Sequence, residues 1–289
     1  MYEETEGNEM DILERIKELY PRLTKKQKGI ADYLISNPED MCYITLAQLS
    51  QNTDASELTL LRFCQKIGCE NFLELKSRFR EYTQHMIKVA SSPSYFAMER
   101  VSGSESERVN LLRGISEQEA IAANEFFATV DYEEVIAAAD EIKKSKCIYI
   151  FAHDISKIPG VFLESRLRLL YFDAELVDLS SLAETQRRLE HLTEGDLAIF
   201  FSFPKYFYPM GSIVKKVQET GTPIVTVTNS MASPAAKYSK HILLCPTTTR
   251  AFYNTLTLPM AMLNLLVSCL AIDMVPQAEW QDYVDALPS

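Results

Sequence analysis

Five short apolar runs in the C-terminal part of the chain place the strongest constraint on its fold. They cover residues 147–151, 174–179, 196–201, 223–228 and 241–245, and helical spacing of apolar residues separates several of them, at 161–171, 182–192 and 213–219. Strands that alternate with helices form right-handed crossovers and a parallel sheet covered on both faces. The sequence therefore predicts an α/β domain with a five-stranded parallel sheet in doubly wound order.

The N-terminal part has a different pattern and is predicted to be all-α. Thr24 and Gln27 form a capping-box pattern that should open a helix. A short helix near 46–50, a turn at 53–55 and a second helix over 56–67 follow with the spacing of a helix-turn-helix motif. The turn carries Asp where Gly is commonest, and Asp enters the left-handed region more readily than most residues.

The second helix of this motif is expected to read DNA. Leu60 and Phe63 should face the core, which leaves polar and cationic side chains outward or along the flank. The predicted DNA contacts are Ser56, Glu57, Thr59, Arg62 and Lys66, with Lys25 and Lys26 from the preceding helix. For the two lysines, an ordinary solvated face is an equally good interpretation. Arg62 is the foremost candidate.

The chain of 289 residues is long enough for two domains. We expect a helix-turn-helix domain over residues 1–90, a polar linker over 91–115 and an α/β domain over 116–289. The last expected helix, 253–274, is apolar around most of its circumference. It should be buried either in the core of its own domain or against a second subunit.

Composition limits the kind of function. A net charge of −11 argues against a protein that coats nucleic acid non-specifically, so that DNA contact must be local. The six cysteines are scattered without close C-x-x-C pairs, and the four histidines fall in unrelated segments, so that no metal site or cofactor is expected. There is no secretory signal and no apolar run long enough to cross a membrane, which favours a cytoplasmic location.

The helix-turn-helix segment resembles a known family. Residues 46–68, and within them Ser56-Glu57-Leu58-Thr59-Leu60-Leu61-Arg62-Phe63-Cys64, together with Phe72-Leu-Glu-Leu-Lys76, are similar to the RpiR-type transcription regulators. These proteins join a helix-turn-helix domain to a SIS (sugar isomerase) domain. The resemblance implies a homodimer or higher homo-oligomer that binds a double-stranded DNA operator, controls genes of sugar or amino-sugar metabolism, and responds to a phosphosugar.

The SIS half departs from the family pattern where the ligand should bind. The resemblance implies effector contacts at Ser156, Ser202, Thr228 and Asn229, although a structural role at the end of the strand is an equally good interpretation of Thr228 and Asn229. Lys205 could replace lost donors with a point charge. However, the loop over 152–156 lacks the expected glycines and adds Asp154, and the loop over 202–207 lacks the second serine, the glycine and the threonine. We therefore predict an altered site that binds common hexose or amino-sugar phosphates weakly.

Two other functions remain open at this stage. A phosphosugar isomerase would need a base beside a bound phosphate, and His153 is the obvious candidate, although a lone His near a strand end is more often structural. Alternatively, the α/β domain only dimerises, and the regulator acts constitutively. DNA affinity would then be the same with and without any metabolite.

Overall fold

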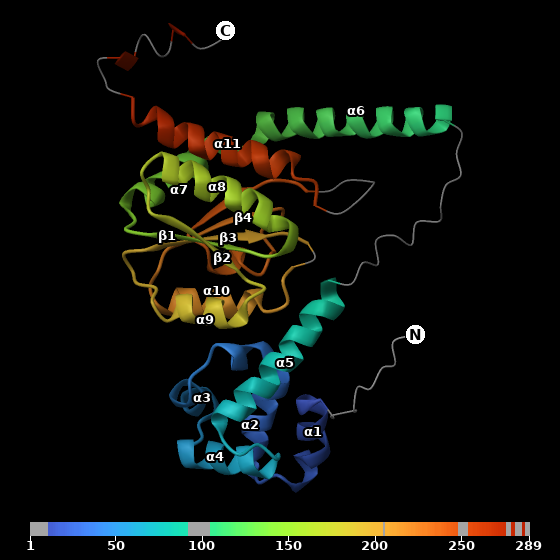
Figure 1. Ribbon diagram of the computed structural model, residues 1–289, viewed down its shortest axis with the longest axis vertical. Coiled ribbons are helices and arrows are strands. Elements are labelled where there is room, and N and C mark those ends of the chain that lie inside the picture. The colour runs from blue at the N-terminus through green and yellow to red at the C-terminus, as the bar shows by residue number, and fades with distance from the viewer. Residues whose placement is uncertain are drawn as a thin grey trace, which may run out of the picture. The chain divides into compact units, whose positions relative to one another are not determined.

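The computed structural model describes residues 11–91, 105–204, 206–247, 254–275, 279–280 and 285–286. The chain divides into two compact units, Met1–Ser92 and Pro93–Ser289 (Figure 1).

The described part of the first unit consists of helices and short 3-10 turns, as the sequence predicts. The elements are α1 (Ile12–Leu19), η1 (Tyr20–Arg22), α2 (Lys25–Ser36), η2 (Pro38–Cys42), α3 (Leu46–Thr53), α4 (Glu57–Lys66) and α5 (Phe72–Ser91). Thr24 caps α2 in the expected capping box, in which its hydroxyl accepts from Gln27 N at 3.4 Å and Gln27 Oε1 accepts from Thr24 N at 3.1 Å. Thr45 and Gln48 form a second capping box at the start of α3.

One core of aliphatic and aromatic side chains seats α4 in this unit. Leu60 and Phe63 from α4 are buried with Leu34 from α2 and Phe79 from α5, and Leu49 joins them from α3. Each turn of α4 therefore has an apolar anchor on its inner side. Burial of apolar surface stabilises the folded state by about 25 cal/mol per Å² removed from water. Because a ten-residue helix is marginal on its own, α4 is stabilised mainly by this core.

The first described helix of the second unit was predicted only in part. Helix α6 spans Glu105–Thr129, so residues 105–115, which were expected to lie in the linker, are helical. In Figure 1, most of α6 extends away from the sheet and only its C-terminal end lies near α11. Phe126 is the one buried residue of α6. Because the first turns of this helix have no buried face, they carry no apolar periodicity for a sequence pattern to detect.

The rest of this unit is the predicted doubly wound α/β domain. Its strands are β1 (Ile148–Ala152), β2 (Ala174–Asp178), β3 (Leu197–Ser202), β4 (Ile224–Thr228) and β5 (His241–Leu244), all parallel, in the order β2-β1-β3-β4-β5. Its helices are α7 (Tyr132–Lys144), α8 (Lys157–Leu169), α9 (Leu182–Leu189), α10 (Met210–Glu219) and α11 (Thr257–Ile272), with η4 (Asp154–Ser156) and η5 (Ala236–Tyr238) between them. Helices α7, α8 and α11 cover one face of the sheet, and α9 and α10 cover the other (Figure 1).

Burial at the centre of the sheet explains why the sequences of the central strands are continuous apolar runs. All six residues of β3 are buried. Phe200 of β3 stacks on Phe151 of β1 with ring centroids 4.6 Å apart. Gly160 lets α8 approach the sheet, because a Cβ at this position would lie 2.8 Å from Leu176 Cδ1. Helix α11 is buried in its own domain through residues such as Leu263 and Leu266, which favours the first of the two interpretations of its apolar surface.

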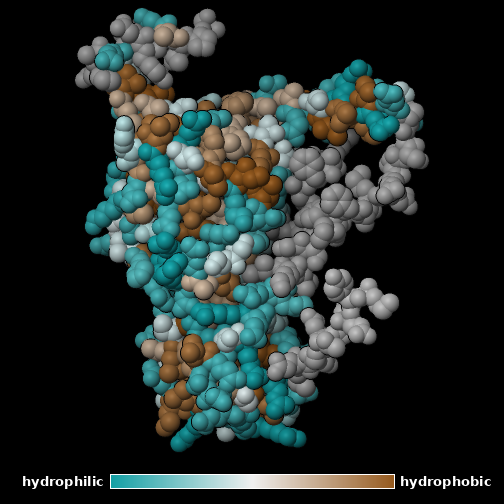
Figure 2. Space-filling model, in the orientation of Figure 1, coloured by the Kyte–Doolittle hydropathy of each residue, from teal (hydrophilic) through white to brown (hydrophobic). Residues whose placement is uncertain are grey.

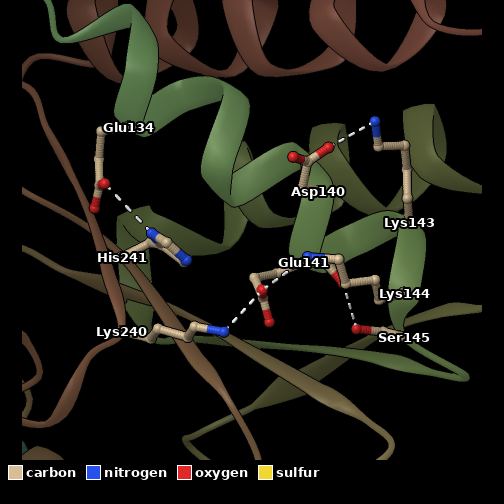
Figure 3. A network of polar contacts seen from close by, with 8 residues as sticks. All are labelled: Glu134, Asp140, Glu141, Lys143, Lys144, Ser145, Lys240 and His241. Atoms are coloured by element: carbon tan, nitrogen blue, oxygen red, sulfur yellow. Dashed lines mark hydrogen bonds and ion pairs between the residues drawn. The ribbon is translucent and has the colours of Figure 1, made fainter.

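A polar network joins α7 to the edge strand β5 (Figure 3). Glu134 accepts a hydrogen bond from the backbone N–H of Ile242 at 2.7 Å, and its other carboxylate oxygen lies 3.3 Å from His241 Nδ1. Glu141 accepts from Lys240 at 2.8 Å, and the second of these carboxylates is nearly buried. The carboxylates thereby hold the outer edge of β5 against α7.

We expect the Glu141→Gln variant to be less stable than the wild type near neutral pH, by about 0.5–1.5 kcal/mol, since the partner Lys240 is half exposed. The Lys240 hydrogen bond lowers the pKa of Glu141 below its ordinary value of 4.5 in the folded chain. The carboxylate therefore contributes stability above about pH 4.5 and loses it as the pH falls through the lowered value. Urea unfolding at neutral and acid pH should show the wild type and the variant converging in acid; a gap that persists in acid would contradict this role.

Candidate DNA-binding surface and effector site

The turn before α4 is built as the helix-turn-helix prediction requires. Asp54 adopts the left-handed conformation, with φ at 49°, and Ala55 N donates to Ser50 O at 3.2 Å. Ser50 Oγ donates to Ala55 O at 2.6 Å, which closes the turn from the other side. Ser56 is the N-cap of α4 and accepts from Thr59 N at 3.3 Å. The start and the direction of α4 are thus determined by local hydrogen bonds.

Helix α4 has one buried side and one exposed side. Leu60, Phe63 and Cys64 are buried. At 3.6 residues per turn, the side opposite to them carries Leu58, Leu61, Arg62 and Gln65, and all four are exposed. Arg62 has no ion-pair or hydrogen-bond partner among the described residues, so its guanidinium is available for a base edge or a phosphate. Leu58, Leu61 and Gln65 were not among the predicted DNA contacts, which were charged and hydroxyl side chains, because apolar residues in a helix are usually buried.

The other predicted DNA contacts lie along the flanks of α4 or on α2. Ser56 and Thr59 hydrogen-bond to each other at 2.9 Å, which makes them part of the cap. Lys66 donates to the carbonyl of Arg22 at 2.5 Å and so ties the end of α4 to η1. Glu57 is exposed in the first turn of α4, and Lys25 and Lys26 are exposed in the first turn of α2. These residues frame the exposed side of α4 without contacting Arg62 in any described interaction.

The effector residues expected from the resemblance lie at the carboxyl ends of β1, β3 and β4, where a doubly wound sheet usually binds ligands. Ser202 pairs with Thr228 across β3 and β4, and Thr228 Oγ1 donates to Ser202 O at 2.6 Å. The hydroxyl of Ser202 is buried and has no hydrogen-bond partner among the described residues. Ser156 is buried at the end of η4, and Asn229 accepts from the Tyr206 hydroxyl at 3.3 Å. Lys205 lies outside the described residues.

Aromatic rings and an ion pair lie beside these residues. The imidazole of His153 packs on Phe207 with ring centroids 4.3 Å apart, and its Nδ1 lies 3.3 Å from Ser180 Oγ. Burial lowers the pKa of His153, which favours the neutral imidazole at neutral pH. Lys157, in the first turn of α8, is paired with Asp178 at 3.1 Å. This edge of the sheet therefore presents hydroxyl groups and an amide, whereas the Lys157 ammonium is already paired with the Asp178 carboxylate.

Two matches to known domains decide the family. Residues 10–86 match the helix-turn-helix domain of the rpiR family, and residues 141–269 match the SIS domain. The chain is an RpiR-type transcriptional regulator. Both halves of the regulator thus agree with the resemblance seen in its sequence.

The regulator is similar to relatives over most of its own length and most of theirs. An uncharacterized HTH-type transcriptional regulator of Haemophilus influenzae is 24% identical, over 81% of this chain and 79% of its own. A second uncharacterized HTH-type transcriptional regulator, from Caldanaerobacter subterraneus, is 23% identical over 95% of this chain and 93% of its own.

Solved structures share the fold of the regulator. The sugar isomerase domain of an RpiR transcription factor from Sphaerobacter thermophilus has a TM-score of 0.54 at 22% identity and covers 61% of this chain and 99% of that one. The Vibrio vulnificus NanR protein, complexed with ManNAc-6P, has a TM-score of 0.50 at 16% identity and covers 95% of each chain.

A cavity of about 830 Å³ lies beside β5 in the regulator. The cavity is lined by Phe126 near the end of α6, by Val130 just after that helix, and by Met262 from α11. Ile242 and Leu244 from β5 also line it, together with Asn229. Ser156, Ser202 and Thr228 are not among its lining residues, so this cavity is distinct from the expected effector site and shares only Asn229 with it.

The described residues of the regulator contain neither a candidate membrane span nor a candidate metal site. No helix there combines the length and the hydropathy that a membrane span requires. No group of three or more His, Cys, Asp and Glu side chains there is arranged to hold a metal ion.

Proposed function

We propose that this regulator is a cytoplasmic homodimer that reads a palindromic DNA operator through α4, with Arg62 contacting a base edge in the major groove. We assign DNA binding to residues 1–90 and dimerisation and effector binding to residues 116–289; residues 91–115, which include the first turns of α6, connect the two. One observation carries the proposal: α4 is anchored by Leu60 and Phe63 on one side, and on the other it presents an exposed Arg62 that has no partner among the described residues.

A dimer follows from how such motifs recognise DNA. The major groove admits one helix, and the second half-site lies one helical turn, about 34–36 Å, along the duplex. Two copies related by a two-fold axis would place two α4 helices at that spacing. Lys25 and Lys26 are exposed at the N-terminus of α2, where cationic side chains can contact the phosphates beside the groove.

We further propose that the α/β domain binds a small sugar derivative and that a phosphate group contributes little to its affinity. NanR, which shares the fold, binds ManNAc-6P. In this chain, Pro204 and Phe207 occupy the loop that would supply donors to a phosphate, and Lys157 is already paired with Asp178. The buried hydroxyl of Ser202, which lacks a partner among the described residues, supports a polar ligand at the carboxyl end of β3.

An isomerase function is less well supported. His153 would have to act as the base, but it packs on Phe207 and faces the Ser180 hydroxyl. The relatives with whole-length similarity are transcriptional regulators. We therefore propose that the SIS domain senses its ligand without converting it.

One experiment tests both parts. The full-length chain is used to select binding sequences from a random duplex pool, and the enriched site is titrated by gel shift with and without a panel of free and phosphorylated hexoses and amino sugars. We expect an enriched palindrome, and an affinity that changes with a free sugar or amino sugar more than with its phosphate. Failure to enrich any site would refute the operator proposal.

The effector arm has its own outcomes. Saturable stabilisation in a thermal-shift assay by a hexose or amino-sugar phosphate, but not by the unphosphorylated sugar, would refute the weakened phosphate site. Operator binding that no metabolite changes would instead favour an α/β domain that only dimerises. Turnover of a phosphosugar by the wild type but not by His153→Ala would favour the isomerase.

A further inference from the structure

The exposed side of α4 is more apolar than a DNA-binding surface needs to be. Leu58 is 58% exposed and Leu61 is 37% exposed, and the two are one turn apart on the same side of the helix. Single exposed leucines are common on protein surfaces. These two, however, lie opposite Leu60, Phe63 and Cys64, so they form the part of α4 that enters first into any groove the helix occupies. In Figure 2, apolar surface interrupts the hydrophilic surface of the N-terminal unit around α4.

The chemistry of the major groove identifies what such a pair can contact. Base edges there present hydrogen-bond donors, acceptors and one apolar group, the C5-methyl group of thymine. A leucine pressed against a donor or acceptor leaves that polar group without water or a partner, which is unfavourable. A leucine against a thymine methyl removes apolar surface of both groups from water.

The position of Leu58 in the helix strengthens this assignment. It is the second residue of α4, directly after the Ser56 cap and Glu57, and residues at the N-terminal end of a recognition helix are those that contact bases. Arg62 lies four residues further on the same side, about 6 Å along the helix axis. That separation corresponds to roughly two base-pair steps.

We propose that Leu58 and Leu61 form an apolar surface that reads the C5-methyl groups of thymines, within about two base pairs of the base contacted by Arg62. This inference rests on the proposed operator binding through α4. It adds a specificity that the charged residues cannot supply, because guanidinium and ammonium groups recognise acceptors, which guanine and thymine both present.

The test removes one methyl group at a time from the DNA. Each thymine of the selected operator is replaced in turn by deoxyuridine, which keeps base pairing and lacks only the methyl group, and the dissociation constant of the full-length chain is measured. We expect a loss of about threefold to tenfold at one or two positions in each half-site, as the loss of one buried methyl group predicts. The Leu58→Ala variant should bind operators that carry thymine or deoxyuridine at one of these positions with equal affinity.

A matched control separates this effect from a general loss of apolar surface. Leu73 is 72% exposed on the first turn of α5, so the Leu73→Ala variant should keep the wild-type thymine preference. Because Leu58, Leu61 and Leu73 are exposed, the variants should keep the wild-type melting temperature.

The outcomes distinguish this inference from the operator proposal. A wild-type chain that binds its operator specifically but is insensitive to deoxyuridine at every position would overturn the methyl reading alone. So would a Leu58→Ala variant whose thymine preference is unchanged, or one that changes the oligomeric state without DNA, since Leu58 would then contact a second copy. Failure to find any operator would overturn both.

Discussion

Replacing Arg62 with alanine should weaken binding to the selected operator by about 1–3 kcal/mol, which is about 5-fold to 150-fold in the dissociation constant. The guanidinium is exposed beside Leu58 on the side of α4 that faces away from the core, and no described residue pairs with it. Truncation therefore removes a contact to DNA and leaves the interior untouched. A gel-shift titration at fixed salt, with a circular dichroism melt to check folding, measures both effects.

The specificity of this loss distinguishes a base contact from a phosphate contact. If Arg62 binds a base, the operator should lose more affinity than a scrambled duplex, and discrimination at one base pair should relax. Arg15 is a matched control, since it is exposed on α1 and paired with Glu18 at 3.7 Å. Unchanged affinity in the Arg62→Ala variant would remove Arg62 from the DNA-binding surface.

Replacing Phe63 with alanine should destabilise the N-terminal unit by about 3–5 kcal/mol, the range for a buried phenylalanine in a core. Phe63 is fully buried in the same cluster as Leu34 and Phe79, so its removal leaves a cavity beneath α4. Small domains are stable by only about 5–15 kcal/mol, and this loss is a large share of that. Specific DNA binding should fall with the folded fraction.

Hydrogen exchange resolved by segment measures this effect within the full chain. Amides of α4 and α5 should lose protection in the Phe63→Ala variant, while those of β3 and β4 keep it, because they lie in the other compact unit. Phe127→Ala is the control: Phe127 is 45% exposed on α6, and its truncation should change stability by less than about 0.5 kcal/mol. Wild-type protection of α4 in the Phe63→Ala variant would show that Phe63 does not hold this helix in place.

The helix-turn-helix unit resembles the family pattern more closely than the loops at the carboxyl edge of the α/β sheet do. The helix-turn-helix unit keeps the cap at Ser56, the left-handed turn at Asp54 and the anchor at Phe63. The α/β unit keeps the strand order, whereas the loops at its carboxyl edge carry the His153–Phe207 packing and the Lys157–Asp178 pair. These observations support the two proposals made above: operator recognition through α4, and an effector site that differs from the family pattern.

Local signals in the sequence determined the helix-turn-helix motif and the sheet. The caps at Thr24 and Ser56 act over a few residues. The runs that form β1, β3 and β4 are apolar because these central strands are buried on both faces, so the pattern and the structure have the same cause. The doubly wound order also followed, since right-handed crossovers leave few alternatives.

Tertiary structure decided the rest. The start of α6 at Glu105 has no buried face, so no periodicity marks it. The bond from Lys66 to Arg22 and the burial of Ser202 beside Thr228 join residues far apart in the chain, and no local pattern encodes such pairings. Leu58 was not expected at the DNA-binding surface, because apolar residues in a helix are usually buried. Its 58% exposure was established only by the folded structure.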